Sequence, residues 1–498
     1  MVSGRISRRA LLGGTAAIAV SAAACTGPSN PGVARKTLGV GATLEPPTLD
    51  PTQSDAASIP QLLLYNVYET LVKMDADGKI KPLLAQRWDV SNDGMEYTFT
   101  LQSGAKFASG TPVDAKAVAT GIEKMRTSSS ATIKKQLAPI DTVAAQGDGT
   151  VVVKLKQPSN AWLYSMTSTP GIIVDPAVSD MATAPMGSGP FAYSTWTKGD
   201  SITLTKNLNY WGTPGRFDEV TFRYYVEANA MISAMLAGDL DVISNLQAPQ
   251  SLSQFSDTSR FTVVEGTTTG EVTMGFNHKN PALAQLKVRQ AICYAIDRRA
   301  LLNTVWAGHG QLIGSMASPT EPYYEDLSDT YPYDPAKAKA LLAEAGVTNL
   351  TLRFRVPVTK YATDSATFVQ SQLKDVGIST TIEQLDFARW YTDVFVKGDY
   401  DLTIVAHVEP RDLVAWADPK YYWHYNNTEL QSLVTRADAG SADDYARLMK
   451  QAARLLADDA AADWLFLLPN LVVTTSDVTG IGPNATSLSF DLTTIASR

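Results

Sequence analysis

Cysteine and histidine are scarce in this chain. Its 498 residues include 2 Cys and 4 His, too few for a multi-cysteine zinc site or a disulfide framework. The four His, at positions 278, 309, 407 and 424, show no i,i+3 or i,i+4 pairing. Each is therefore interpreted as a hydrogen-bonded structural residue. No metal and no cofactor are predicted.

A block of positive charge is also missing. Lys and Arg number 42 against 50 Asp and Glu, a formal net charge of −8. Binding to nucleic acid needs clustered cations that neutralise phosphates, so a nucleic-acid partner is excluded. After the N-terminus no apolar run reaches the roughly 18 residues of a membrane-spanning helix. The longest, over 460–473, is interrupted by Asp463, Pro469 and Asn470, which excludes a polytopic membrane protein.

Motifs of the common enzyme classes are absent as well. The chain has no Gly-x-Ser-x-Gly elbow, no His-Glu-x-x-His, no Cys-x-x-Cys and no phosphate-binding Gly-x-x-x-x-Gly-Lys loop. We therefore predict that the protein is not an enzyme. Scattered carboxylates that folding brings together as an acid–base pair keep a secreted enzyme as an alternative.

The first 24 residues have the pattern of a secretory signal peptide: three Arg, an apolar stretch over 11–20, then three Ala. Cys25 follows at the cut site. This resembles the bacterial lipobox, in which the Cys receives a lipid and becomes the new N-terminus. Ala22 stands where that pattern usually has Leu, so a plain secretion signal is the alternative. Arg8-Arg9 also resembles a twin-arginine export signal. Residues 25–36 are predicted to be the lipidated Cys and a tether, on the outer face of the cell membrane.

Strands and helices alternate in the predicted body of the protein. Runs rich in Val, Ile, Thr, Tyr and Phe predict strands over 38–43, 97–102, 151–155, 202–206, 220–225, 261–265, 272–276, 350–356, 380–385 and 402–405. Apolar residues at helical spacing predict helices after the caps Asp114 and Asp334, over 288–296 and 367–376, and near 445–456. Cys293 falls in one of them and is predicted to be a buried small hydrophobe. The fold class is therefore α/β, with sheets covered by helices.

Four ordered stretches carry a family resemblance. The first, between residues 45 and 115, contains EPPTLDP, YNVYETLV and GTPVDA, and the second, at 187–211, contains GSGPF and NYW. The third, at 276–298, contains FN and VRQAICYAIDR, and the fourth, at 333–378, contains YDPAKA and VGI. Together they resemble the extracytoplasmic solute-binding proteins of the peptide/nickel class (family 5), the substrate-binding lipoproteins of ABC importers.

The resemblance implies a two-lobed periplasmic-binding-protein fold of type II, with an extra subdomain in the first lobe. Lobe I is assigned to 36–74, 188–262 and 470–498, the extra subdomain to 75–187, and lobe II to 263–469. A peptide is expected between the lobes, and an ABC permease with its ATPase are the expected partners of a monomeric protein. A glycoside, an opine-like conjugate or a nickel chelate is the alternative ligand, and a solute sensor is an alternative role.

The same resemblance suggests which residues contact the ligand. In peptide-binding relatives an acid that captures the peptide amine lies in the loop after the strand matching 402–405. By position this acid is Asp412, with Glu409 second. Alternatively, Asp412 pairs with Arg411 or caps the next helix. Arg411 is a candidate partner for a ligand carboxylate, and Lys360 lies near the carboxylate-binding Arg of short-peptide binders.

Aromatic residues are dense between 390 and 425. Their rings can form the wall of a peptide pocket or stack on sugars, and Trp390 and Trp416 are the two selected as ligand contacts. His407 lies beside the expected cleft. Glu45, in a Pro-rich loop, completes the predicted ligand-binding set.

Overall fold

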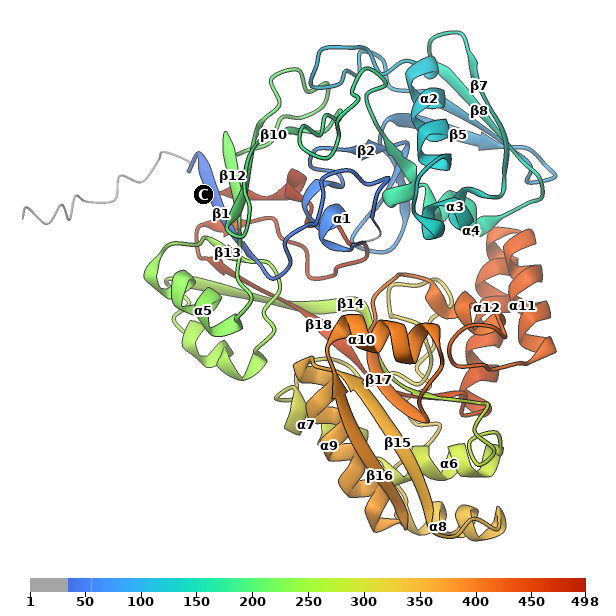
Figure 1. Cartoon of the computed structure of the whole chain (residues 1–498). Helices are drawn as coiled ribbons and strands as arrows, with labels where there is room; N and C mark the ends of the chain where they lie inside the picture. The colour runs from blue at the N-terminus through green and yellow to red at the C-terminus, as the bar shows by residue number, and fades with distance from the viewer. Residues whose placement is uncertain (1–34, 55) are drawn as a thin grey trace, which may run out of the picture. The chain divides into compact units, whose positions relative to one another are not determined.

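The computed structural model describes residues 35–54 and 56–498. The predicted signal peptide and Cys25 lie outside this part of the chain. A ten-stranded mixed sheet is its main element, and Figure 1 shows how the helices lie around it. In spatial order the strands are β10 (Phe191–Thr197), β11 (Ser201–Lys206), β12 (Glu219–Tyr224), β1 (Thr37–Ala42), β13 (Val242–Ile243), β18 (Ala462–Thr475), β14 (Phe261–Phe276), β17 (Leu402–His407), β15 (Leu350–Pro357) and β16 (Ile378–Leu385).

The two longest strands of this sheet, β14 and β18, pair antiparallel at its centre. In Figure 1 they run together from the part that holds β1 and β13 to the part that holds β15 and β17. Their register breaks between Thr267 and Glu271, so Thr268–Gly270 have no partners in this ladder. Such a break bends a strand and frees backbone and side chains from the ladder.

Four helices pack with β14, β15, β16 and β17 around one hydrophobic core. They are α6 (Leu286–Ala295), α7 (Arg298–Val305), α8 (Pro335–Glu344) and α9 (Lys360–Asp375). Asp334 caps α8 by accepting a hydrogen bond from the Lys337 amide at 2.9 Å, as predicted. Cys293 belongs to this core and is 1% exposed, which confirms its predicted burial.

A second core is unusually aromatic and contains Trp390, Trp416 and Trp423. Its helical segments are α10 (Phe387–Trp390), the π-helix Tyr391–Val396, the 3-10 helix Asp412–Ala417, α11 (Thr428–Ala439) and α12 (Ala442–Asp458). The indole rings of Trp416 and Trp423 stack with centroids 3.7 Å apart. The dense aromatic segment is therefore mainly core packing.

A separate antiparallel sheet of four strands lies in residues 85–155, in the order β5-β6-β8-β7. Its strands are β5 (Ala85–Val90), β6 (Glu96–Leu101), β8 (Thr150–Leu155) and β7 (Ile140–Gln146). It shares a core with α2 (Ala115–Arg126), α3 (Ala131–Leu137) and α4 (Asn160–Ser165). Asp114 caps α2 through the Ala117 amide at 2.8 Å, as predicted.

The other elements are short. Helices α1 (Ser58–Leu63) and α5 (Ala228–Ala237) pack beside the ten-stranded sheet. Two-stranded pairings join β2 (Glu69–Thr70) to β9 (Ile172–Ile173), β3 (Val72–Met74) to β4 (Ile80–Pro82), and β19 (Val478–Thr479) to β20 (Ala496–Ser497).

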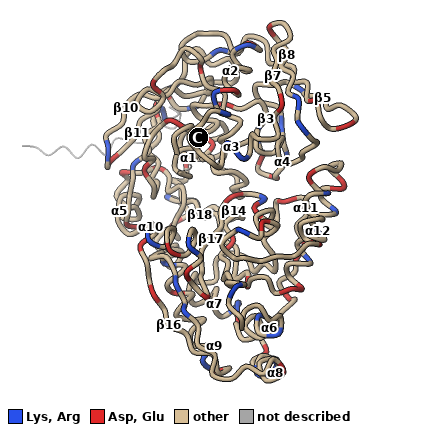
Figure 2. Tube along the Cα trace, turned by 45° about the vertical axis from the view of Figure 1, so that its right-hand side comes forward, with Lys and Arg blue, Asp and Glu red and all other residues tan. Residues whose placement is uncertain are grey.

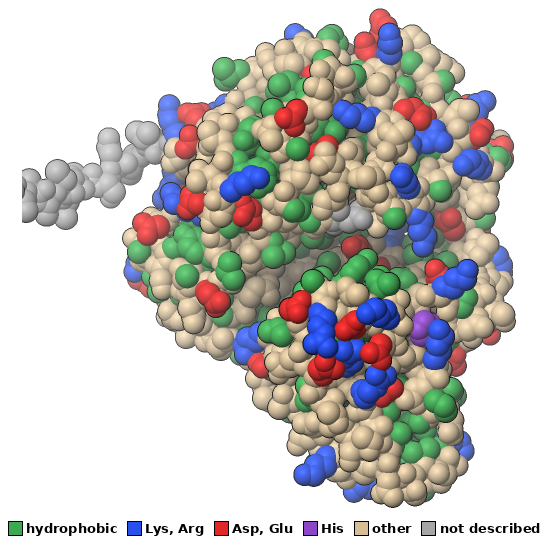
Figure 3. All heavy atoms as spheres, in the orientation of Figure 1, with side chains coloured by type: hydrophobic (Ala, Val, Ile, Leu, Met, Phe, Trp, Pro, Cys, Tyr) green, Lys and Arg blue, Asp and Glu red, His purple; other side chains and the backbone are tan. Residues whose placement is uncertain are grey.

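Charges of both signs are interspersed along the described chain, as Figure 2 shows. On the face in Figure 3 a mixed charged patch lies near α10, with hydrophobic side chains gathered just above it. Ion pairs near α10 join Arg353 to Asp399 at 2.5 Å and Lys397 to Asp393 at 2.8 Å. Within residues 35–54 and 56–498, no helix has the length and apolar character to cross a membrane, and no cluster of three or more metal-ligating side chains occurs.

Candidate functional site

A cavity of about 190 Å³ lies at the carboxyl ends of three strands. β1 runs parallel to both β12 and β13, so the three strands end at the same edge of the sheet. In α/β sheets this edge is where ligands usually bind. The segments that follow β1 and β13, 43–44 and 244–247, line the cavity, together with Phe222 and Tyr224 of β12.

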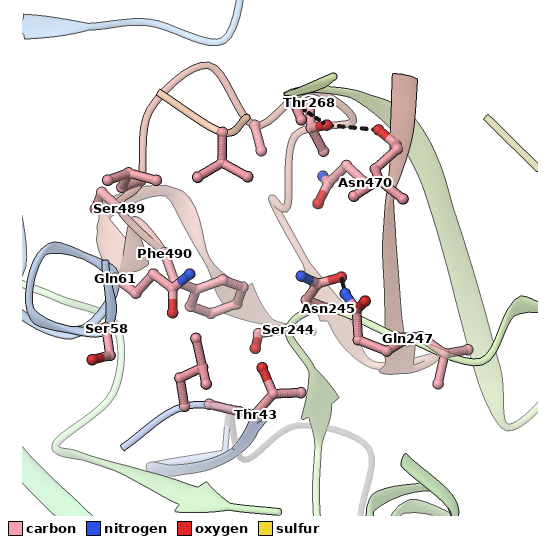
Figure 4. A pocket seen from close by; sticks show the side chains of 18 of the residues that line it. Thr43, Ser58, Gln61, Ser244, Asn245, Gln247, Thr268, Asn470, Ser489 and Phe490 are labelled. Carbon is pink, nitrogen blue, oxygen red and sulfur yellow. Dashed lines mark hydrogen bonds between the residues drawn. The ribbon is translucent and has the colours of Figure 1, made fainter. Parts of the chain in front are cut away.

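The break in the central strand pair forms another wall of the same cavity. Thr268–Gly270, left without ladder partners in β14, line it together with Leu468–Asn470 of β18. Ala485 and residues 487–490, near the C-terminus, line the cavity together with Gln61 of α1. Figure 4 shows the ring of Phe490 among Gln61 and Asn245.

The lining is polar and aromatic but carries no Asp, Glu, Lys, Arg or His. Part of its hydrogen-bonding capacity is already used: Thr268 Oγ1 donates to the Leu468 carbonyl at 2.6 Å, and Gln247 Nε2 donates to Asn245 Oδ1 at 2.7 Å. The side chains of Thr43 and Gln61 make no hydrogen bond among the described residues, so they can form hydrogen bonds to a ligand. The cavity therefore suits an uncharged polar group.

A group of three carboxyl side chains begins one residue beyond the cavity lining. Glu271 follows Gly270 of the lining and is 2% exposed. Asp412 and Glu321 interact electrostatically with it. Glu321 is held by two backbone amides, Ser318 N at 2.9 Å and Arg411 N at 2.6 Å.

The carboxyl groups of Glu271 and Asp412 have fewer hydrogen-bond partners than that of Glu321. Glu271 Oε2 and Asp412 Oδ2 are buried and have no hydrogen-bond partner among the described residues. Burial, reinforced by the neighbouring carboxyls, raises the pKa of both groups well above the ordinary carboxyl range. A buried carboxylate that lacks a partner is costly, so the pair is suited to receive hydrogen-bond donors from a cation.

His407 is the nearest cationic candidate for Asp412, with its Nδ1 3.7 Å from Asp412 Oδ2. Burial lowers the pKa of His407 to about 4, so the ring is neutral at pH 7 and no ion pair forms. Its Nε2 lies 2.9 Å from the Tyr422 hydroxyl. His407 therefore supplies no cation to Asp412.

Arg411 also does not neutralise Asp412. Its guanidinium carbon lies 4.0 Å from the ring centre of Tyr164 and 5.3 Å from that of Tyr445. Within the described residues no ion pair joins it to a carboxylate, and its backbone is left-handed, with φ of 61°. Asp412 begins the 3-10 helix, and no side chain caps that helix. Both alternatives considered for Asp412, pairing with Arg411 and capping, are thus absent.

The contact of Arg411 with Tyr164 links α4 to the segment from 411 to 440. The same segments are also joined by the Asp438 carboxylate, which accepts hydrogen bonds from the Ala161 amide at 2.8 Å and from the Ser159 hydroxyl at 2.9 Å. Asn160 Nδ2 donates to the Gly440 carbonyl at 2.7 Å. We call these contacts of residues 159–161 with Asp438 and Gly440 the α4 latch.

The other predicted contact residues lie elsewhere. Trp390 and Trp416 are 3% and 1% exposed and belong to the aromatic core. Lys360 is exposed and pairs with Asp364 at 2.5 Å. The Glu45 carboxylate accepts hydrogen bonds from Trp196 and Gly199, although its neighbour Leu44 lines the cavity. The structure therefore groups Asp412 with His407 and Arg411, with Glu409 exposed in the same loop. None of the eight predicted contact residues is part of the cavity lining, although Val408 of this loop is.

Several cavity residues were not predicted from the sequence: Thr43, Gln61, Asn245, Thr268, Asn470 and Phe490. A usable signal existed for one of them, because Thr43 ends a predicted strand. The others depend on the strand order and on the break in β14, which local patterns do not reveal. Glu271 stands one residue before a predicted strand and was not singled out.

Comparison with known proteins adds a family match. A model described as bacterial extracellular solute-binding proteins, family 5 Middle, matches residues 79–458. The probable D,D-dipeptide-binding periplasmic protein DdpA of Escherichia coli (strain K12) is 28% identical over 477 residues, covering 87% of this chain and 89% of that protein.

Solved structures show the same fold. The PBP AgaA in complex with agropinic acid, from A. tumefaciens R10, superposes with a TM-score of 0.78 at 26% identity, covering 93% of this chain and 99% of that one. CtaP from Listeria monocytogenes gives a TM-score of 0.83 at 21% identity, covering 93% and 100%. These likenesses confirm the predicted α/β class and the two-lobed periplasmic-binding-protein fold.

Proposed function

The chain belongs to the bacterial extracellular solute-binding proteins of family 5, and on this premise we propose that it captures a peptide for an ABC importer and delivers it to the membrane permease. The single observation that carries the proposal is the buried Asp412 carboxyl oxygen without a hydrogen-bond partner, in the segment that follows Val408 of the uncharged cavity lining. A peptide offers complementary chemistry: an ammonium at one end and a neutral polar backbone beyond it.

In the proposed mechanism, Asp412 receives the peptide amine and the cavity receives uncharged groups of the ligand. The proposed lobe I (36–74, 188–262 and 470–498, with its subdomain 75–187) and lobe II (263–469) close because the ligand contacts both, so binding favours the closed state. A separate ATPase then drives release through the permease. The protein acts as a monomer and leaves the ligand chemically unchanged.

The lipid anchor is part of the same proposal. DdpA is described as periplasmic, which supports a location outside the cytoplasm, and Cys25 would hold the protein at the outer face of the cell membrane. In cells fed radioactive fatty acid, Cys25→Ala is expected to abolish labelling, because it removes the only proposed acceptor thiol. Cys293→Ala is the matched control and should remain labelled. Labelling of Cys25→Ala would refute the anchor.

Calorimetry with a panel of free di- to pentapeptides tests the peptide assignment. At least one is expected to give a saturable heat, whereas its N-acetyl derivative, which lacks the ammonium, should give none. Absence of binding across the panel would reject the peptide assignment. Chemical conversion of any bound member would instead indicate an enzyme.

A non-peptide conjugate is the second candidate ligand, because AgaA was solved with agropinic acid. An opine-like conjugate also combines an amino-acid part with a neutral polar part. Adding such conjugates to the calorimetric panel distinguishes peptide ligands from opine-like ligands, since only the class that binds gives a saturable heat.

A further inference from the structure

We infer that Glu271 is a second ligand-binding carboxyl group, and that Glu271 and Asp412 together bind one primary ammonium group of the ligand. This inference rests on the proposed function in placing the ligand at Asp412. It adds a residue that sequence reasoning did not select, and it defines the ligand as a primary amine with an uncharged body.

The position of Glu271 supports this role. Its partner in the β14–β17 ladder is His407, which lies close to Asp412. Along β14 it follows the cavity-lining residues Thr269 and Gly270. The Thr269 hydroxyl donates to the Val408 carbonyl at 2.7 Å, which ties this wall to the segment carrying Asp412.

The number of unpaired acceptors fits an ammonium. Glu271 Oε2 and Asp412 Oδ2 each lack a partner among the described residues, and both are buried. A primary ammonium has three N–H donors, so it can give one to each oxygen and a third to a neutral acceptor of the cavity. A tertiary ammonium has the same charge but a single N–H. It can satisfy only one of the two oxygens.

No group of the described chain takes the place of this cation. Glu321 is held by the amides of Ser318 and Arg411, and the Arg411 guanidinium lies against tyrosine rings. His407 is neutral at pH 7. The titratable or charged groups around the pair are Tyr164, Glu321, Tyr323, His407, Glu409, Arg411, Tyr421, Tyr422 and Tyr445.

Ligand binding should be coupled to the release of a proton. Two adjacent carboxyls with raised pKa values retain a proton in the empty site. An arriving ammonium favours the charged form of both groups, so binding releases a proton. Between about pH 5 and pH 7, where an α-amino group remains protonated, affinity is therefore expected to rise with pH.

The experiment is calorimetry on the full protein with four probes: trialanine, N,N-dimethyl-trialanine, N-acetyl-trialanine and the non-peptide amine 4-aminobutanamide. Glu271→Gln keeps the size of the side chain and is expected to weaken binding of the primary amines by about 10-fold or more. Glu265→Gln is the control, because Glu265 lies on the same strand but bonds His309 at 3.0 Å. It should bind like the wild type.

Dimethylation of trialanine should weaken binding to the wild type by about 10-fold, and by much less in Glu271→Gln, since the second acceptor is already gone. In two buffers of different ionisation enthalpy, proton release should be detected with the wild type and reduced in Glu271→Gln. Because dimethylation is measured on the wild type, it tests the inference even when the variant does not fold.

Each outcome separates the inference from the proposed function. Unchanged trialanine affinity in Glu271→Gln, or equal affinity for the dimethyl probe in the wild type, overturns the role of Glu271 and leaves the peptide assignment standing. Binding of 4-aminobutanamide that depends on Glu271, without binding of peptides, supports the inference and rejects the peptide assignment. Failure of both primary amines to bind overturns both.

Discussion

Asp412→Asn is expected to weaken ligand binding by about 100-fold, or roughly 2.7 kcal/mol. The substitution removes the negative charge that receives the ligand ammonium while keeping the size of the side chain. The fold should not suffer, because Asp412 Oδ2 is buried and has no hydrogen-bond partner among the described residues. Calorimetry for affinity and urea denaturation for stability measure the two effects separately.

Asp418→Asn is the matched control for this substitution. Asp418 lies six residues further along and accepts a hydrogen bond from the Lys420 amide at 2.9 Å, which an Asn oxygen can also accept. Its ligand affinity should equal that of the wild type. Unchanged affinity in Asp412→Asn would remove Asp412 from the binding site and contradict the proposed orientation of the peptide.

Gly187→Ala is expected to destabilise the protein by about 3 kcal/mol or more, the range of severe steric substitutions. A Cβ at this position would lie 2.0 Å from the Val67 carbonyl oxygen and 2.8 Å from Cδ1 of Tyr68. Both neighbours are buried, so relief requires the backbone to move. Urea denaturation should show a lower midpoint, with the loss of free energy calculated at constant m.

Gly149→Ala is the control, because a Cβ there would meet no atom within 4 Å and the backbone is not left-handed. Its stability should remain within about 0.5 kcal/mol of the wild type. If Gly187→Ala were equally stable, the close approach of this segment to Val67 would not be needed for the fold.

Local signals were sufficient for much of the fold. The capping residues Asp114 and Asp334 begin helices in the structure, because a cap depends on residues only three positions apart. The strands 261–265 and 272–276 were predicted separately but are two ends of β14. The intervening Thr and Gly residues interrupt the strand pattern, and the structure has a break in register there.

Longer-range features could not be predicted in this way. β18 was not predicted as a strand, because it is buried along most of both faces and shows an apolar run instead of alternation. Gly187, in the GSGPF segment, is required by its close approach to Val67, a residue 120 positions earlier along the sequence. Such a contact exists only after folding.

The candidate site also combines a residue that the sequence predicted with features that only the folded structure reveals. Asp412 was selected from its position in a family pattern, and the structure adds its unpaired oxygen. Glu271 comes close to it only through the pairing of β14 with β17, which sets Glu271 opposite His407, the neighbour of Asp412. The neutral character of the cavity likewise depends on segments from 42 to 490 meeting in space. None of these features has a local sequence signature.

Small-angle X-ray scattering with and without a peptide found by calorimetry tests the central claim most directly. The α4 latch and the Arg411–Tyr164 contact join residues of the proposed subdomain 75–187 to residues of the proposed lobe II, so ligand that draws the lobes together should stabilise these contacts. Ligand is therefore predicted to lower the radius of gyration of the wild type, and Asp438→Ala, which removes the latch carboxylate, should reduce this change. Identical scattering profiles at saturating ligand would contradict capture by closure.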